Sequence, residues 1–198
     1  METKKGVKKQ YLLSMALGDG YINSAGYLVI RHSVRQKEYL QWKVNLLKSA
    51  GIKTTDVYDV NNNNYPGVEA RTYNHDFIKV CRKILYKPSK RIAQRKVLDN
   101  LSALGIAIWY MDDGGLSIRR KNGKISSFQI MLNTCLSKEE NDIIIQYFKE
   151  RWNVSFYSCK NKGRYRLVCG TREGRKFLNI VAPFVQQVPC MLYKILVQ

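Results

Sequence analysis

The sequence predicts an α+β protein made of two similar halves that are related by pseudo-two-fold symmetry. Three observations support this fold class. An apolar helix that ends in an Asp-Gly pair within residues 11–22 recurs at residues 105–116, so that Asp19 and Asp113 lie 94 residues apart. The same succession of hairpins and helices follows each copy. The 198 residues are enough for one sizeable domain, or for two small domains that share a core.

The first half, residues 1–87, is expected to run helix, hairpin, helix, hairpin, helix. Its opening apolar helix leads into a hairpin that turns at residues 23–26, where Asn and Gly favour a turn. An amphipathic helix follows at residues 36–52. The second hairpin is predicted to turn at residues 61–67, between extended runs at 54–60 and 68–73, and a helix near residues 74–85 ends the half.

The second half, residues 102–198, repeats this order after a linker at residues 88–101 that begins with Pro88. Its first hairpin turns at Asn122-Gly123, which is a strong signal for a tight turn. Ser137 and Glu140 form a capping box that opens a helix at residues 137–154. A hairpin that turns at residues 161–163 and a helix near residues 172–181 follow, and Pro183 and Pro189 indicate an irregular tail.

The composition points to an intracellular nucleic-acid-binding protein. The formal net charge is +19, from 34 Lys and Arg against 15 Asp and Glu, and nucleic acid is the usual partner of so basic a chain. A generally basic surface and an anionic membrane are the alternatives. The five widely spaced cysteines predict neither disulfides nor a zinc site, and the two histidines show no metal-type spacing. With no membrane span or signal peptide expected, we predict a soluble protein.

The two repeated helices both end in aspartates, which indicates a function for these residues. Negative charge is unfavourable at a helix C-terminus, yet both copies place aspartates there. If the helices pack together through small residues, with Ala16 and Gly18 opposite Gly105 and Ala107, Asp19 and Asp113 meet at one point. Two neighbouring carboxylates bind hard cations such as Mg²⁺. The alternative is an ordinary glycine-terminated helix end whose aspartates face water.

These motifs resemble a known family. "LLSMALGDG" and "IAIWYMDDG" are similar to the paired signature helices of LAGLIDADG homing endonucleases. The "PCMLYK" stretch near the C-terminus extends the resemblance to the single-chain branch that the mitochondrial omega-intron endonuclease represents. The similarity covers nearly the whole chain. Each motif is degenerate, but their order and spacing together are fairly specific.

The resemblance implies a fold and a reaction. Two αββαββα halves would share a two-helix interface and place a saddle of antiparallel strands on the DNA major grooves. The enzyme would hydrolyse both strands of a specific double-stranded DNA site across the minor groove, leaving short 3′ overhangs. Mg²⁺ would be the cofactor, with Mn²⁺ as a substitute. The chain is expected to act as a monomer.

The resemblance also assigns roles to individual residues. Metal binding falls on Asp19 and Asp113, which precede the glycines of the two motifs, and Gly18 and Asp112 adjoin this metal site. For Asp112 we favour a local role at the helix end over direct metal binding. Lys90 and Lys194 match basic residues that act near the scissile phosphates, although Lys90 is equally suited to touch the DNA backbone.

Strand alternation selects the residues that would face DNA. In each strand, apolar residues alternate with neighbours that would lie on the opposite face. The residues expected to face the core are Leu28, Ile30, Leu116, Ile118, Phe128, Ile130 and Leu132. Arg reads guanine, and Gln or Asn reads adenine. The predicted DNA-contacting residues are Tyr27, Arg31, Ser33, Ser117, Arg119, Gln129 and Asn133. The alternative is a solvated sheet face.

Two other functions stay open from the sequence. A non-cleaving binder on the same fold, such as an intron RNA maturase or a transcription regulator, would not need paired acids that face phosphate. A basic structural or ribosome-associated protein predicts no duplicated Asp-Gly helix ends. An endonuclease that also binds intron RNA agrees with the same pattern. Neither the DNA target, the host element, nor the compartment (bacterial or phage cytoplasm, or an organelle) can be predicted from these residues.

Overall fold

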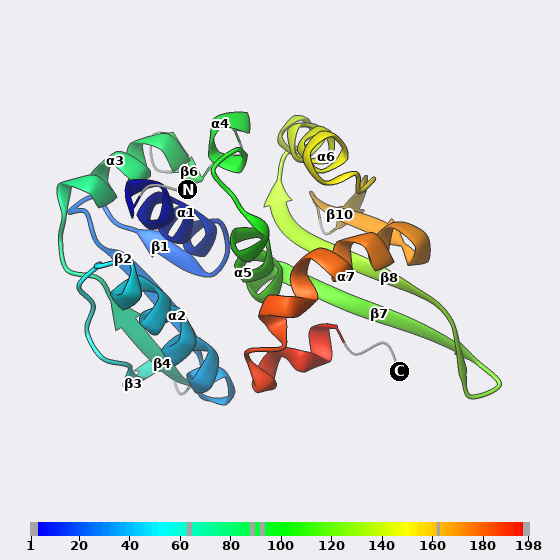
Figure 1. Ribbon diagram of the computed structural model, residues 1–198, viewed down its shortest axis with the longest axis horizontal. Helices are drawn as coiled ribbons and strands as arrows, with labels where there is room; N and C mark the ends of the chain where they lie inside the picture. The colour runs from blue at the N-terminus through cyan, green and yellow to red at the C-terminus, as the bar shows by residue number, and fades with distance from the viewer. Residues whose placement is uncertain (1–3, 63–64, 88–89, 92–93, 162, 196–198) are drawn as a thin grey trace.

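The computed structural model describes residues 4–62, 65–87, 90–91, 94–161 and 163–195, and these form the two predicted halves on either side of a pair of helices (Figure 1). The first half consists of α1 (Lys4–Leu17), β1 (Gly20–Ile22), β2 (Leu28–Ser33), the short 3₁₀ helix η1 (Val34–Gln36), α2 (Lys37–Ser49), β3 (Tyr58–Asn62), β4 (Tyr65–Arg71) and α3 (Asp76–Leu85). The second half consists of α5 (Ala103–Asp113), β7 (Gly114–Lys121), β8 (Lys124–Leu136), α6 (Lys138–Trp152), β9 (Tyr157–Asn161), β10 (Arg164–Gly170), α7 (Thr171–Val185) and the 3₁₀ helix η2 (Pro189–Lys194). The predicted α+β class and the order of elements are confirmed.

The two four-stranded antiparallel sheets have the same topology. Their strand orders are β1-β2-β4-β3 and β7-β8-β10-β9. The residue after each signature aspartate begins a strand in the same way, since Gly20 pairs with Ile30 and Gly114 pairs with Leu132. Asp19 and Asp113 therefore occupy equivalent positions in the two halves.

The predicted alternation of the strands is confirmed. In β2, Leu28 and Ile30 are buried whereas Arg31 and Ser33 are exposed. Asn122 and Gly123 both have positive φ, 52° and 75°, which a two-residue hairpin turn with the twist of its strands requires. The β7–β8 hairpin that they close projects from the body of the second half (Figure 1).

Helices α1 and α5 pack against each other at the centre of the molecule (Figure 1). Small residues allow the close approach, but the register differs from the predicted one. Gly18 faces Asp112, its equivalent in the second half, and a Cβ at Gly18 would overlap the Asp112 carboxylate. Gly105 faces Ser14. The glycine of one helix thus makes room for an acidic side chain of the other, and this places both helix ends at one site.

Three sequence-based boundaries need correction. The turn predicted at residues 61–67 is tighter, because β3 extends to Asn62 and β4 begins at Tyr65. Pro183 lies inside α7 rather than in an irregular tail, and Pro189 begins η2. Helix α1 begins by Lys4, well before the apolar segment that signalled it.

The stretch between the halves contains some regular structure. It consists of β5 (Tyr86–Lys87), β6 (Lys90–Arg91) and α4 (Arg95–Leu98). The domain boundaries 1–87, 88–101 and 102–198 remain predictions. The capping box of Ser137 and Glu140 at the start of α6 is confirmed, and all five cysteines are free thiols. Within the described residues, none of the helices combines the length and apolar character that crossing a membrane requires.

Candidate active site

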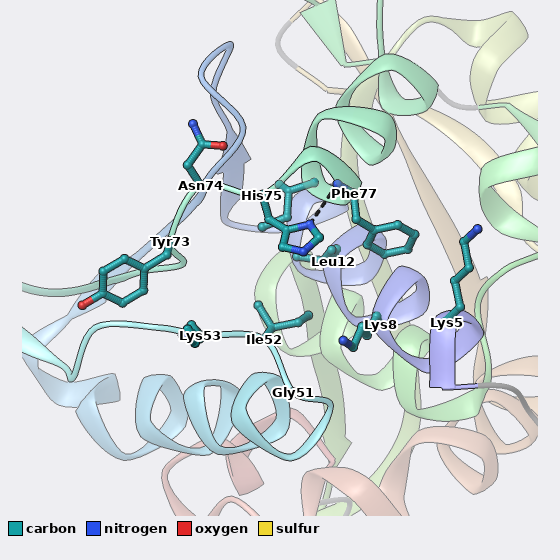
Figure 2. Close-up of a pocket in the computed structure, with 11 residues that line it drawn as sticks. Lys5, Lys8, Leu12, Gly51, Ile52, Lys53, Tyr73, Asn74, His75 and Phe77 are labelled. Carbon is teal, nitrogen blue, oxygen red and sulfur yellow. Dashed lines mark hydrogen bonds between the residues drawn. The ribbon is translucent and has the colours of Figure 1, made fainter.

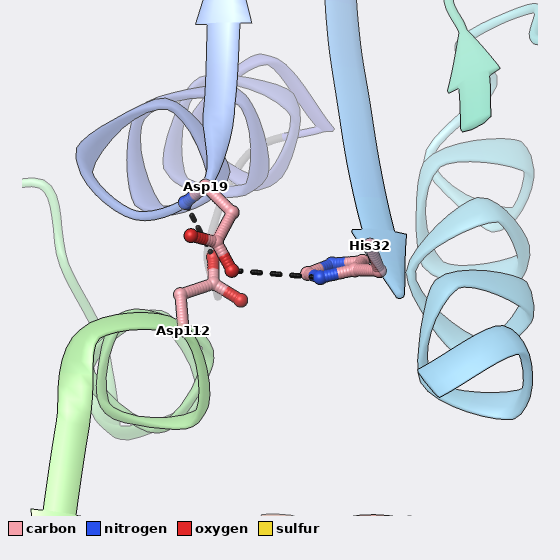
Figure 3. A group of neighbouring side chains, drawn as sticks. All are labelled: Asp19, His32 and Asp112. Atoms are coloured by element: carbon pink, nitrogen blue, oxygen red, sulfur yellow. Dashed lines mark hydrogen bonds and ion pairs between the residues drawn. The ribbon is translucent and has the colours of Figure 1, made fainter. Parts of the chain in front are cut away.

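Asp19 lies in the two-residue turn that connects α1 to β1. Its side chain is 41% exposed, and its backbone N–H donates a hydrogen bond to Asp112 Oδ2 at 3.1 Å. Asp19 Oδ2 lies 3.4 Å from Nδ1 of His32, which reaches it from β2. Figure 3 shows both carboxyl groups turned toward each other, with the His32 ring pointing at Asp19. The site therefore combines an accessible carboxylate with buried groups that orient it.

The Asp112 carboxylate connects the two helices rather than facing solvent. Its side chain is fully buried, and Oδ1 accepts hydrogen bonds from Lys43 Nζ at 2.6 Å and from the Tyr39 hydroxyl at 2.8 Å. Oδ2 accepts from the Asp19 backbone N–H. Both oxygens are thus occupied by protein donors. This arrangement supports the local role that we favour for Asp112 over the predicted metal contact.

Lys43 is a charged side chain buried in the core face of α2. It is fully buried, where its ammonium contacts both Asp112 and His32 Nε2, the latter at 3.1 Å. Burial and then the charge of Lys43 lower the pKa of His32 to about 3, so the ring is neutral at pH 7. Burial, followed by the charge and hydrogen bond of Asp112, raises the pKa of Tyr39.

Asp113 is the last residue of α5 and directly follows Asp112. Its Oδ2 accepts a hydrogen bond from Trp109 Nε1 at 3.2 Å, and its backbone carbonyl accepts one from Asn133 Nδ2 at 3.0 Å. The negative charges of Asp19 and Asp113 both contribute to the raised pKa of the Tyr39 hydroxyl. Because Asp113 adjoins Asp112, which accepts a hydrogen bond from the Asp19 backbone, the two predicted aspartates lie in one cluster.

Lys194 of η2 neutralises the end of α5. This buried ammonium donates to the backbone carbonyls of Tyr110, Met111, Asp112 and Gly114, the last at 2.9 Å. Burial lowers the pKa of Lys194, and the charges of the three aspartates act in the opposite direction. A cation at the carbonyl end of a helix offsets the dipole that makes aspartates unfavourable there. Three carboxylates, two ammonium groups and a neutral imidazole leave the cluster with one negative charge.

The structure describes the surroundings of Gly18, a predicted site residue, but not those of the Lys90 side chain. Gly18 is buried against Asp112, so its visible role is to allow the close approach of the helices. The Lys90 side chain lies outside the described part of the structure, so its predicted role near phosphate stays a prediction.

Arg31, predicted to read DNA, is held by a buried glutamate. Its Nε donates to Glu69 Oε2 at 2.9 Å, and Arg71 Nε donates to Glu69 Oε1 at 2.6 Å. The Tyr58 hydroxyl completes this group. Burial alone would raise the pKa of Glu69, but the hydrogen bonds from Tyr58, Arg31 and Arg71 outweigh it and lower that pKa. Arg31 is half-exposed and has a fixed orientation on the sheet face.

The other predicted DNA-contacting residues lie where the strand alternation places them. Ser117 and Gln129 are direct cross-strand neighbours, and Arg119 is exposed further along β7. Ser33 is exposed at the end of β2, and Tyr27 is half-buried just before it. Asn133 differs from the others, because its amide group binds the backbone at Asp113 and so supports the active site.

Sequence reasoning missed His32, Lys43, Tyr39 and Glu69. The signal for His32 was available, because the alternation that buries Leu28 and Ile30 also buries residue 32. Lys43 occupies a core position of α2, between Leu40 and Leu47, where a charged residue is unusual. A charge on an apolar helix face requires a partner, but the sequence does not identify that partner as Asp112.

A separate groove lies at the other end of α1. Its floor is apolar, with Leu12, Ile52 and Phe77, and Lys5 and Lys8 lie beside it (Figure 2). His75 lines it as well, and its Nδ1 accepts a hydrogen bond from the Phe77 backbone N–H at 3.0 Å. Lys5 is about 20 Å from Asp19 along the helix, at 1.5 Å per residue. The groove is therefore distinct from the aspartate cluster.

Comparison with known sequences yields two kinds of relative. The chain is 25% identical over 201 residues to the probable intron-encoded endonuclease 1 of Wickerhamomyces canadensis, covering 98% of this chain and 86% of that protein. It is 26% identical over 203 residues to protein RecA of Mycolicibacterium chitae, covering 94% of this chain. The chain spans only 46% of that RecA relative's length.

Solved structures share the fold. The homing endonuclease I-WcaI bound to its DNA recognition sequence matches with a TM-score of 0.81 and 23% identity, covering 100% of this chain and 88% of that one. I-DmoI in complex with DNA and Mn matches with a TM-score of 0.54 and 15% identity, covering 90% and 97%. The family model of the LAGLIDADG DNA endonucleases matches residues 9–177. This protein therefore belongs to the LAGLIDADG DNA endonuclease family.

Proposed function

We propose that this protein is a homing endonuclease that cuts both strands of a specific double-stranded DNA site and leaves short 3′ overhangs. One observation carries the proposal: Asp19 and Asp113, from equivalent positions of a duplicated fold, converge at the ends of two packed helices. A protein that only binds DNA has no need to hold carboxylates beside phosphate. The intron-encoded relative and the DNA-bound neighbours agree with this activity.

The residues present fit a divalent cation, and we propose Asp19 and Asp113 as its ligands. Asp19 is accessible, and the cluster as a whole carries a negative charge. Carboxylate oxygens are the ligands that Mg²⁺ prefers, and Mn²⁺ accepts the same set. A bound divalent cation would activate water and stabilise negative charge on the phosphate. I-DmoI has been crystallised with DNA and Mn, which agrees with this metal class.

His32 and Asp112 suit this metal site less well, although both lie near Asp19. Ligand atoms of Asp19, His32 and Asp112 fall within 4.8 Å of one another. However, Lys43 donates to both His32 and Asp112, and a cation that replaced those contacts would approach a buried ammonium group. We therefore assign Asp112 and His32 to the support of Asp19 rather than to the metal. Gly18 contributes the space that this support requires.

The two lysines have different proposed roles. Lys194 is proposed to supply buried positive charge beside the aspartates, where it binds the backbone carbonyls that end α5. Lys90, which follows the first half, is proposed to contact a phosphate near the cut.

We propose that the two sheets bind the DNA through the faces that carry Arg31, Ser117, Arg119 and Gln129. The net charge of +19 supplies a strong attraction to phosphate. One chain provides both halves, so a monomer suffices to cut both strands. Intron RNA is a second proposed partner, which the intron-encoded relative suggests.

Cleavage of a randomised duplex library would test this function. The purified protein is incubated with the library and either Mg²⁺ or Mn²⁺, and the new ends are sequenced. A common recognition sequence at ends with short 3′ overhangs is expected. Selection of a specific duplex without any cutting would instead identify the non-cleaving binder, and absence of both would contradict the DNA function.

A further inference from the structure

We propose that Lys43 is a positioning residue that fixes the tautomer of His32 and, through His32, the orientation of the Asp19 carboxylate. The same ammonium group holds Asp112, so one buried cation connects the ends of both signature helices. The proposal rests on the function proposed above, in which Asp19 binds the metal.

The contacts form a continuous chain from α5 to Asp19. Asp112 Oδ1 lies 2.6 Å from Lys43 Nζ, and Lys43 Nζ lies 3.1 Å from His32 Nε2. On the opposite side of the imidazole, Nδ1 lies 3.4 Å from Asp19 Oδ2. Lys43 is fully buried, and the His32 side chain is 1% exposed. Of this chain, the Asp19 carboxylate alone reaches solvent substantially.

The chemistry of the donors determines where the His32 proton lies. An ammonium group has no lone pair and can only donate, so Nε2 of His32 must accept. A neutral imidazole has one N–H, which must then be on Nδ1. Nδ1–H faces Asp19 Oδ2, an acceptor. At 3.4 Å this contact is longer than a typical N–H···O hydrogen bond, but its acceptor is a charged carboxylate oxygen. This is the arrangement by which outer partners orient a ligand and tune its affinity.

The second half shows that the fold does not itself need these charges. The strand position equivalent to His32 is Thr134, since both lie two residues beyond the partner of the glycine that follows the signature aspartate. Thr134 Oγ1 donates to Asn141 Oδ1 at 2.7 Å, so a neutral pair fills this place. The charged chain is therefore specific to the Asp19 side of the site.

The tautomer can be observed directly because the protein has only two histidines. His75 Nδ1 accepts from the Phe77 backbone N–H, which places its proton on Nε2 and makes it an internal reference of the opposite tautomer. Two-bond ¹⁵N–¹H spectra of histidine-labelled protein at pH 7 are expected to show His32 protonated on Nδ1. A His32 proton on Nε2 in the unaltered protein would overturn the proposal.

A double variant separates positioning from folding. Lys43→Met alone leaves Asp112 buried without its cation, so it is combined with Asp112→Asn to remove both charges together. We expect the double variant to stay folded, to lose the fixed Nδ1–H tautomer of His32, and to leave the His75 signals unchanged. Lys43→Arg keeps a positively charged donor at position 43, so this single variant is expected to retain part of the Nδ1–H tautomer of His32. If the folded double variant keeps the His32 tautomer, Lys43 does not set it.

Mn²⁺ binding, measured by electron paramagnetic resonance of the free ion, tests the consequence for Asp19. Loss of outer partners lowers metal affinity by about 10–100-fold, and we expect a decrease in this range for the double variant. The surface variant Asp142→Asn serves as a control, since its charge pairs with Lys138 on the exposed face of α6. Unchanged Mn²⁺ affinity with an altered tautomer would overturn the positioning role but leave the proposed function intact. Absence of Mn²⁺ binding and of library cleavage in the unaltered protein would instead contradict the proposed function.

Discussion

The two halves have the same strand order but support their signature aspartates differently. In the first half, buried Lys43 and His32 lie behind Asp19. In the second half, the neutral pair of Thr134 and Asn141 fills the equivalent strand position, and Asp113 contacts Trp109 instead. Duplication explains the shared topology, whereas these substitutions make the two carboxylates chemically unequal.

The ends of the two signature helices differ as well. Helix α1 is followed by Gly18, which makes room for the Asp112 carboxylate. Helix α5 ends in two acids, and Lys194 compensates by binding the carbonyls of its last turn. In this protein the residues around the two acids therefore differ between the halves. Matching substitutions in the two halves should therefore have unequal effects.

The largest effect is expected from removing a proposed metal ligand. Asp19→Asn and Asp113→Asn keep the side-chain shape but remove the charge, so each should slow cleavage by more than about 100-fold, beyond the loss typical of outer partners. DNA binding should survive, because less negative charge faces the phosphates. Cleavage of a supercoiled plasmid that carries the target, with gel-shift assays beside it, measures both properties.

The same assay examines the difference between the halves. If each aspartate mostly serves one strand, each variant should accumulate nicked plasmid, and the two should nick opposite strands. Asp112→Asn should impair cleavage less than either. Linear product formed at the unaltered rate by both Asp19→Asn and Asp113→Asn would show that the catalytic assignment is wrong, whereas loss of binding by both would indicate purely structural helix ends.

The next largest effect concerns stability, where the buried charges of the first half contrast with the neutral pair of the second. Lys43→Met alone leaves the buried Asp112 carboxylate without its cation and should reduce the free energy of unfolding by about 3–5 kcal/mol. Thr134→Val removes the hydroxyl that donates to the buried Asn141 Oδ1 and should cost about 1–3 kcal/mol. Urea denaturation of both variants measures the difference. Equal losses would mean that the charged cluster is no more critical to folding than the neutral one.

A pH dependence should follow from His32. Its pKa in the folded protein is about 3, below the ordinary 6.5, so the unfolded chain binds an extra proton between these values. Stability from this group is thus fully present above pH 6.5 and declines as the pH falls toward 3, by roughly 1 kcal/mol per pH unit. His32→Phe should flatten this part of the stability profile measured by urea denaturation. An unchanged profile would mean that His32 is already charged or solvated in the folded state.

Much of the fold could be predicted from the sequence because local patterns determine it. Alternation identified the core face of β2 and β8, and Asn122-Gly123 identified the tight hairpin. The turn predicted at residues 61–67 is too broad, because its asparagines favour turns on their own, whereas cross-strand pairing with β4 extends β3 to Asn62. Tertiary pairing overrode local propensity there.

The candidate site was only partly predictable. The repeat located Asp19 and Asp113, because the duplication preserves their spacing from the following strand. Lys43 could not be assigned, because its partner Asp112 is 69 residues away in sequence. Glu69 likewise has partners on two other strands, and only the sheet register brings them together. Long-range polar pairing is what a single sequence does not show.

The smallest expected effect compares an arginine on each sheet. Arg119 of β7 forms no ion pair with any residue that the structure describes, whereas Glu69 holds Arg31 of β2. If each contacts a guanine bidentately, Arg→Ala should relax specificity at a few base pairs by about 1–3 kcal/mol. We expect this for Arg119→Ala. For Arg31→Ala we expect the lower end, because its Nε and one terminal nitrogen already bind Glu69 and fewer donors are left for a base.

Selection from the randomised library at fixed salt measures this contrast position by position. A salt titration serves as the control, because a lost phosphate contact reduces the slope of log K against log salt by about 0.9 without changing base preference. Uniform weakening across all sequences for Arg119→Ala would make it a backbone contact. A larger loss of specificity for Arg31→Ala than for Arg119→Ala would contradict this expectation. It would mean that Glu69 orients Arg31 toward a base, and that the arginine with the fixed orientation contributes more to base recognition.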